Sequence, residues 1–185
     1  ARIPLQVYAA KNTDEKIRMH SSSGGVFSIL AEQTIKQGGV VFGARFDENW
    51  EVKHDYTETI DGVSVFRGSK YVQSKTGDTF KQAEQFLKQN RKVLFSGTPC
   101  QIVALKRYLK KEYENLLLVD FICHGVPSPG VWRKYLKQVI ALTCDKNTVS
   151  SHLKLLLSER NALVEGISFR DKRLGWQKYS FSLTL

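Results

Sequence analysis

Two cysteines hold the sequence positions best suited to chemistry. Cys100 follows the stretch "VLFSGTP" at the start of a helix-like pattern, and Cys123 closes the apolar run "NLLLVDFIC". The thiolate is the form of cysteine that attacks electrophiles and binds metals, and the positive end of a helix favours negative charge. Three chemistries fit the pair: a redox disulfide, a cysteine nucleophile with His124 as its base, and a metal or iron–sulfur site.

Two of these chemistries usually need more than this pair of cysteines supplies. A redox disulfide is typically built on a C-x-x-C motif, which the sequence lacks, and a thiolate-held iron–sulfur cluster takes four ligands. Free cysteines are also commonly small buried apolar residues, and we assign Cys144, in a polar stretch, to that class. For Cys100 and Cys123 we favour a shared site, because their positions in the predicted fold converge.

The elements around the two cysteines predict this convergence. Strand 93–95, helix 100–111 and strand 116–122 form a βαβ unit at 92–122, whose strands we expect to be parallel neighbours. The carboxyl ends of such strands lie at one edge of a sheet, about 5 Å apart laterally, and open α/β sheets bind ligands beyond that edge. The sequence therefore directs both cysteines into one ligand crevice.

The rest of the chain alternates between strand-like and helix-like stretches, which predicts an α/β fold with a mixed sheet flanked by helices. A β-hairpin is expected at 39–56, a third short strand at 62–66 ("GVSVF"), and a fully buried strand at "NLLLVDFIC". Helices are expected after the glycines at 24 and 25, within 76–90 and within 131–142. We expect one domain over 1–185, with a connector at 143–163 and terminal strands at 164–185.

Three clusters combine hydroxyl or basic side chains with glycine or an aromatic ring. Residues 21–25 ("SSSGG") precede a helix and offer backbone N–H groups to a phosphate. Residues 67–74 ("RGSKYVQS") add two cations, a ring and hydroxyls, and residues 170–179 ("RDKRLGWQKY") repeat the combination. Each cluster alone fits a helix cap or a surface turn equally well. Together with the cysteine pair, they indicate a phosphorylated, planar, redox-active ligand.

The composition limits the compartment and the partners. The 185 residues carry 28 Lys and Arg against 18 Asp and Glu, a net charge of +10, which attracts polyanions. We interpret most of this charge as solvated helix faces and expect no nucleic-acid binding, because the aromatic residues do not interleave with the cations as in known modules. Three cysteines without a secretory pattern, and no apolar run of about 18 residues, predict a cytoplasmic protein without a membrane span.

Five motifs in chain order resemble the coenzyme F420 hydrogenase/dehydrogenase beta-subunit family: "SSSGGVFSIL", "GSKYVQS", "GTPCQIVALK", "ICHGVPSPGVW" and "SFRDKRLGW". The resemblance covers about 7–176. It implies a flavin- and iron–sulfur-dependent oxidoreductase that binds FAD and a 4Fe–4S cluster and passes electrons between a ferredoxin-type donor and a small acceptor, which is coenzyme F420 in some members. An acidic electron-transfer protein such as ferredoxin suits the basic chain as a partner. The resemblance does not predict the oligomeric state.

The same resemblance implies roles for individual residues. Cys100 and Cys123 fit cluster ligands, and Lys70 fits a position near the flavin or its phosphates. The candidate catalytic residues are Lys70 and, as the base considered above from the residues alone, His124. The candidate cofactor-binding residues are Ser22, Ser23, Gly24, Gly25, Val26, Gly68, Ser69, Lys70, Tyr71, Gln73, Ser74, Gly97, Thr98 and Gln101. The family's other cluster ligands resemble a C-x-x-C pair beyond the "RDK…GW" motif, and many bacterial members carry a ferredoxin-like segment ahead of "VYAAK". We therefore expect the core of a longer protein, with an incomplete ligand set for the cluster in these residues.

Two other functions remain open from the residues alone. One is a transferase or hydrolase in which Cys100 is the nucleophile and His124 the base. The other is a basic binding module without catalysis, for an acidic protein or a nucleic acid. Iodoacetamide labelling of Cys100 with loss of a hydrolytic activity would indicate the first, and salt-dependent retention on heparin without flavin or iron would indicate the second.

Overall fold

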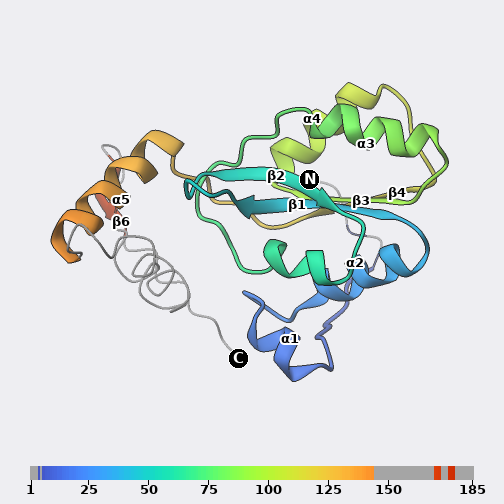
Figure 1. The fold of residues 1–185 in the computed structure, drawn as a ribbon, viewed down its shortest axis with the longest axis horizontal. Coiled ribbons are helices and arrows are strands. Elements are labelled where there is room, and N and C mark those ends of the chain that lie inside the picture. Colours follow the sequence, from blue (N-terminus) through green and yellow to red (C-terminus); the bar gives the residue numbers. More distant parts are fainter. Residues whose placement is uncertain (1–3, 5, 144–168, 172–174, 178–185) are drawn as a thin grey trace. The chain divides into compact units, whose positions relative to one another are not determined.

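The computed structural model describes residues 4, 6–143, 169–171 and 175–177. The chain forms two compact units, Ala1–Pro129 and Gly130–Leu185, and each unit is described by itself (Figure 1). Four of the five sequence motifs fall wholly or mostly in the first unit, which is the one that carries the candidate site.

A four-stranded mixed sheet forms the centre of the first unit. Its strands are β1 (Val40–Phe46), β2 (Val52–Thr57), β3 (Val93–Gly97) and β4 (Leu116–Asp120). They lie in the order β2-β1-β3-β4. β1 and β2 pair antiparallel, whereas β3 is parallel to both β1 and β4. The predicted mixed α/β fold, the hairpin at 39–56 and the βαβ unit at 92–122 are therefore confirmed.

Helices cover both faces of this sheet. α3 (Thr79–Lys88) and α4 (Pro99–Leu109) lie on one face, and α2 (Val26–Lys36) lies on the other with the 3-10 helix η1 (Asp61–Phe66) (Figure 1). Because successive strand residues point to opposite faces, Phe42 and Phe95 pack with α3 and α4, whereas Val41 and Leu94 pack with α2 and η1. Full burial of a large apolar side chain stabilises the fold by about 1.5–3 kcal/mol. Both faces of the sheet therefore anchor the βαβ unit.

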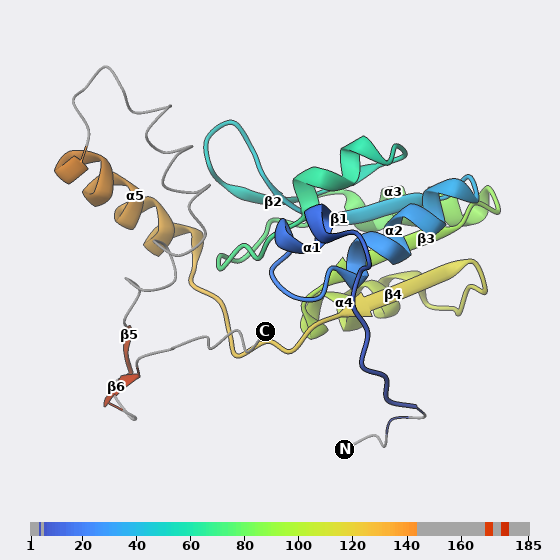
Figure 2. The ribbon, with the colours of Figure 1, turned by 90° about the horizontal axis from the view of Figure 1, so that it is seen from below.

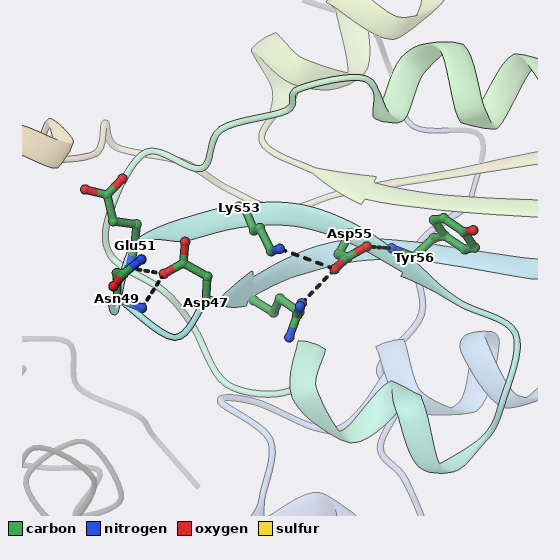
Figure 3. Close-up of polar contacts among 7 residues, drawn as sticks. Asp47, Asn49, Glu51, Lys53, Asp55 and Tyr56 are labelled. Atoms are coloured by element: carbon green, nitrogen blue, oxygen red, sulfur yellow. Dashed lines mark hydrogen bonds and ion pairs between the residues drawn. The ribbon is translucent and has the colours of Figure 1, made fainter. Parts of the chain in front are cut away.

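Carboxylates fix the β1–β2 hairpin at its tip and along its length (Figure 3). Asp47 Oδ1 accepts hydrogen bonds from two backbone N–H groups of the turn, both at 2.9 Å. On β2, Asp55 Oδ2 lies 2.8 Å from Arg45 Nε and 3.9 Å from Lys53 Nζ. Such partly exposed ion pairs contribute at most about 1 kcal/mol. Since side chains alternate along a strand, Lys53 and Asp55 on one face place His54 on the other.

The structure corrects two predictions about short segments. Residues 62–66 lie in the helix η1 and not in a strand. The alternation of "GVSVF" suggests a period of two, but Val63 and Phe66, three residues apart, are the buried pair, while Val65 is 47% exposed. A spacing of three residues matches one turn of a 3-10 helix.

The second correction concerns β4, which is an edge strand and not a fully buried one. It has β3 as its only strand neighbour among the described residues, and Figure 2 shows it at the margin of the sheet. Leu117 is 44% exposed and Phe121, just after the strand, 56%. A continuous apolar run is typical of a central parallel strand, but here it lies on an edge strand. Leu118 packs on one core cluster and Val119 on the other, while Leu117 stays largely exposed. The strand also ends at Asp120 instead of residue 122.

The second unit contains α5 (Pro129–Thr143) and a hairpin of β5 (Phe169–Asp171) and β6 (Gly175–Gln177). α5 confirms the helix predicted within 131–142. The hairpin falls within the predicted terminal strands at 164–185, whose remaining residues lie outside the described ones. The predicted connector at 143–163 lies outside them apart from its first residue. Among the described residues, no helix has the length and apolar character to cross a membrane.

Candidate functional site

The parallel pairing of β3 and β4 brings the two cysteines to one edge of the sheet. Gly97, the last residue of β3, pairs in register with Asp120, the last residue of β4. Cys100 and Cys123 each follow their strand end by three residues. Cys100 is exposed in the first turn of α4, and Cys123 is half-buried in the segment after β4. The predicted common edge is confirmed.

Each sulfur atom has one polar neighbour. Cys100 Sγ lies 3.1 Å from the hydroxyl of Thr98, the N-cap residue of α4. Cys123 Sγ accepts a hydrogen bond from the backbone N–H of Gly125 at 3.4 Å. In the described parts of the chain, no three His, Cys, Asp or Glu side chains gather as a metal site would require. By donor chemistry the two thiols fit a thiolate-held cluster, of whose four ligands they would supply two.

Loop 67–74 connects the other motifs of the first unit. The backbone N–H of Ser69 donates to Ser22 Oγ at 2.6 Å, which joins the loop to the turn at 21–25. Gln101 Nε2 donates to Ser74 Oγ at 2.9 Å, which joins the loop to the start of α4. The backbone N–H of Gln73 donates to the Pro127 carbonyl at 3.0 Å, beyond Cys123. Three segments that are far apart in sequence are thus held around one loop.

A fourth contact fixes the root of the loop on α2. Arg67 Nε donates to the hydroxyl of Ser28 at 3.0 Å, and Ser28 is buried within the helix. Arg67 is therefore held by the protein itself and not aimed at solvent. At the next residue, Gly68 adopts φ = 80°, and a Cβ placed there would meet nothing within 4 Å. This open side leaves room for a ligand group beside Ser69.

The glycines of the turn at 21–25 are needed for packing. Gly25 has φ = 72°, a left-handed conformation that favours glycine. A Cβ on Gly24 would lie 2.9 Å from the carbonyl oxygen of Ala10, and one on Gly25 would lie 3.1 Å from Asn12 Cβ. The N–H of Asn12 also donates to the Gly24 carbonyl at 2.6 Å. The preceding segment, followed by the unpredicted short helix α1 (Glu15–Met19), thus closes one side of the turn.

Lys70 is tied back onto its own loop. Its Nζ donates to the carbonyl oxygens of Val65 at 3.0 Å and Arg67 at 2.8 Å. Burial lowers the pKa of Lys70 from 10.5 to about 8. The ammonium group is therefore charged at neutral pH but gives up its proton more readily than an ordinary lysine. A lysine of this kind suits either electrostatic support of an anion or proton transfer.

His54 is the polar residue of this region that the sequence did not indicate. It is 5% exposed, stacks on Phe95 with ring centroids 5.4 Å apart, and bonds to Ser74 Oγ through Nδ1 at 2.8 Å. Burial lowers the pKa of His54. The alternating burial of "VKHDYT" on β2 is the signal that marks this histidine as an inward-facing residue.

The remaining predicted residues occupy varied positions. Ser23 is exposed on the turn and Val26 begins α2. Tyr71 is half-buried, and Gly97 and Thr98 lie at the junction of β3 and α4. His124 is exposed, and no hydrogen bond joins it to Cys100 in the described structure. Of the cluster at 170–179, Arg170 and Trp176 form a register pair in the second unit, and their side chains are outside the described ones.

For a flavin nucleotide, the residues around loop 67–74 offer suitable chemistry. Hydroxyl and backbone N–H groups meet at the Ser22–Ser69 contact, the side of Gly68 is open, and the cation of Lys70 follows within the same loop. Hydroxyls, amides and a cation are the groups that bind a pyrophosphate. The residues present therefore fit FAD, although the turn at 21–25 is closed on the side of residues 10–12.

Comparisons with known proteins concern the family and the fold of this chain. Residues 7–81 match the family model of the coenzyme F420 hydrogenase/dehydrogenase beta subunit N-terminal part, and residues 90–152 match that of its C-terminal part. The two matches follow each other in the expected order. A search of the curated proteins finds no match.

Among solved structures, the fold is similar to a chain of the F420-reducing NiFe hydrogenase complex from Methanosarcina barkeri, studied by xenon derivatization. The TM-score is 0.54 at 18% sequence identity, and the match covers 75% of this chain and 49% of that chain. At this identity the similarity concerns the fold alone, and the chain spans about half the length of its structural neighbour. From the two matching halves of one family, this chain belongs to the coenzyme F420 hydrogenase/dehydrogenase beta-subunit family.

Proposed function

We propose that this chain is the core of a flavin- and iron–sulfur-dependent oxidoreductase that passes electrons between a ferredoxin-type donor and a small acceptor. Membership of a hydrogenase and dehydrogenase family supports the redox class. The observation that carries the proposal is the convergence of four motifs in the first unit. Loop 67–74 contacts the turn at 21–25, Gln101 and Pro127, and the last two follow the strands that lead to Cys100 and Cys123.

In this proposal the two thiolates of Cys100 and Cys123 hold one side of a 4Fe–4S cluster, and the other ligands come from the longer protein. The start of α4 suits an anionic ligand, since the helix dipole places partial positive charge there. The Gly125 N–H donates to Cys123 Sγ, and hydrogen bonds to cluster sulfurs are one means by which proteins set reduction potentials. When bound, the cluster supplies single-electron transfer and FAD supplies exchange of one or two electrons.

The flavin is proposed to bind along loop 67–74. The Ser22 hydroxyl accepts from the Ser69 N–H and can donate its own proton to the phosphates, and the open side of Gly68 admits them. Lys70 holds a positive charge beside the bound group below about pH 8. Tyr71, in the same loop, carries the aromatic ring that is proposed to pack against the flavin. The residues of this chain thus bind and orient the cofactor and keep a positive charge next to it.

The partners follow from charge. The net charge of +10 favours encounter with an acidic electron-transfer protein, because complementary potentials raise association rates. The same charge suits an anionic acceptor, and the family name makes coenzyme F420 the first acceptor to assay. We place the protein in the cytoplasm, where thiolates stay reduced.

The experiment that tests the ligand assignment uses the full-length parent protein, purified without oxygen. Cys100→Ser and Cys123→Ser should each remove the cluster, measured as iron and sulfide content. Cys144→Ser is the matched control, because we assign it no ligand role, and it should keep the iron of the unmodified protein. Unchanged iron in the Cys100 and Cys123 variants would contradict the assignment.

A further inference from the structure

A buried polar chain runs from β2 to Cys100, and its first member is His54. The imidazole is 5% exposed and stacks on Phe95, so both ring nitrogens must find partners inside the protein. Nε2 lies 2.9 Å from the carbonyl oxygen of Ser96. A carbonyl only accepts hydrogen bonds, so the ring proton sits on Nε2. Nδ1 is therefore an acceptor, and the Ser74 hydroxyl at 2.8 Å donates to it.

The direction of this first bond sets the direction of the next ones. Since the Ser74 hydroxyl has given its proton to His54, its oxygen accepts from Gln101 Nε2 at 2.9 Å. The amide is then held at both ends. Gln101 Oε1 accepts from the backbone N–H of Thr98 at 3.0 Å and from the Thr98 hydroxyl at 3.1 Å. The Thr98 hydroxyl, its proton committed, acts as an acceptor toward Cys100 Sγ at 3.1 Å.

At Gly97 the backbone leaves space for these hydrogen-bonded side chains. A Cβ on Gly97 would lie 3.1 Å from Gln101 Oε1 and 3.6 Å from His54 Nε2. A larger residue there would press on the amide. The segment after loop 67–74 also adds to β2, because the His54 N–H donates to the Lys75 carbonyl at 2.9 Å. Ser74 is thereby held next to the imidazole.

We propose that His54 is a positioning residue for Cys100. It acts through Ser74 and Gln101 to keep the Thr98 hydroxyl turned toward the glutamine amide, so that this hydroxyl accepts from Cys100 Sγ and does not donate to it. When His54 no longer accepts from it, the Ser74 hydroxyl is free to donate to the Gln101 amide instead, and when Ser74 is replaced by Ala the amide loses this anchor. Either change releases the Thr98 hydroxyl to turn toward the sulfur. The proposal concerns residues of this chain alone and goes beyond the cofactor assignment above.

The test compares two substitutions that each keep one of the two imidazole bonds. His54→Asn keeps an acceptor near the Nδ1 position for Ser74, and His54→Gln keeps a donor near the Nε2 position for Ser96. Both are made in the 185-residue chain with Cys123→Ser and Cys144→Ser, so that Cys100 is its only thiol. The readout is the rate of iodoacetamide alkylation at one neutral pH, since Cys100 is exposed and the thiolate is the reactive form.

The proposal predicts faster alkylation in His54→Gln by about fivefold, the factor that one net hydrogen bond makes in an equilibrium constant. Ser74→Ala should reproduce this increase, and His54→Asn should stay within about twofold of the parent rate. A merely structural role would lower the melting temperature of the Asn and Gln variants and change both rates alike. Equal rates in the two variants, in proteins whose circular dichroism shows them folded, would overturn the proposal.

This experiment tests the role of His54 separately from the flavin and cluster assignment. It needs neither flavin nor cluster, so a failure of the cofactor assignment leaves its outcome unaffected. Conversely, equal alkylation rates in His54→Asn and His54→Gln would exclude the positioning role of His54. The cluster assignment would still be tested by the iron content of the cysteine variants. If His54→Gln does not fold, Ser74→Ala still removes the hydrogen bond between Ser74 and Gln101. The same increase in the alkylation rate is expected for this variant.

Discussion

The turn at 21–25 gives a sharp test of how its glycines act, because the chain offers a matched pair. Gly25 and Gly68 both have a positive φ, of 72° and 80°. They differ in their surroundings. A Cβ on Gly25 would lie 3.1 Å from Asn12 Cβ and 3.3 Å from Ser21 Oγ, whereas one on Gly68 would meet nothing within 4 Å. The substitutions Gly25→Ala and Gly68→Ala therefore share the backbone strain and differ in the contact.

The expected losses of stability follow from the backbone strain and from the contacts of the added Cβ. A left-handed conformation costs a residue with a Cβ about 1–2 kcal/mol, so Gly68→Ala should lower the free energy of unfolding by about that amount. Gly25→Ala carries the same strain and also forces Asn12 and Ser21 to move, which adds about 1–3 kcal/mol, the usual cost of overpacking. The difference between the two variants should thus be at least about 1 kcal/mol.

Urea unfolding of the ligand-free chain, followed by circular dichroism, measures both values. Amide hydrogen exchange at Asn12 adds a local readout, since its N–H donates to the Gly24 carbonyl and should exchange faster in Gly25→Ala alone. Equal free energies of unfolding in the two variants would refute the reasoning. The glycines of the turn would then serve a ligand and not the packing against residues 10–12.

Three further predictions concern titration and the core. Because burial lowers the pKa of His54 from 6.5, the unfolded chain binds a proton that the folded chain does not. Stability should therefore fall as the pH drops below 6.5, by up to about 1.4 kcal/mol per pH unit, and urea titrations should show a weaker slope in His54→Asn. Lys70 should lose its proton near pH 8, visible by NMR of labelled lysine as one titration well below the others. Stability should then rise with pH from about 8 toward 10.5 in the parent and less in Lys70→Met, because the folded chain releases this proton first. Leu105→Ala, at a fully buried position of α4, should cost about 2–5 kcal/mol. Val103→Ala, on the same helix but 49% exposed, should cost less than about 0.5 kcal/mol, and equal costs would contradict the assigned core face.

The βαβ unit could be predicted because its signals are local. The apolar run before Gly97, the proline at the first position of α4 and the apolar run after it each indicate one element. Parallel pairing then follows from the general rule for such units. The common edge of Cys100 and Cys123 is a consequence of these elements, and for that reason it too could be read from the sequence.

The contacts around loop 67–74 could not be predicted, because they depend on tertiary structure. The motifs containing Ser22, Ser69 and Gln101 are each visible in the sequence. That Ser69 donates to Ser22, 47 residues away, is fixed only by the packing of α2 and η1 on the sheet. The same holds for Gln101 and Ser74, 27 residues apart. Their side chains bond to each other, which sequence patterns do not reveal.

The errors have similar causes. In "GVSVF" the alternation of small and apolar residues fits a strand. In the structure, however, Val63 and Phe66 lie one helical turn apart in η1 and both pack in the core. The run before Cys123 is apolar except for Asn115 and Asp120, and yet β4 lies at the margin of the sheet. His54 alternates with the charged Lys53 and Asp55 on β2, but that pattern alone does not reveal its partners Ser74 and Ser96, which only the tertiary structure brings to it.

The measurement that tests the central claim most directly is a visible absorption spectrum of the full-length parent protein, purified without oxygen, with flavin and iron determined on the same sample. The account predicts flavin bands above a broad iron–sulfur absorption, both bleached by dithionite. A protein that stays colourless after reconstitution with iron, sulfide and FAD would contradict it.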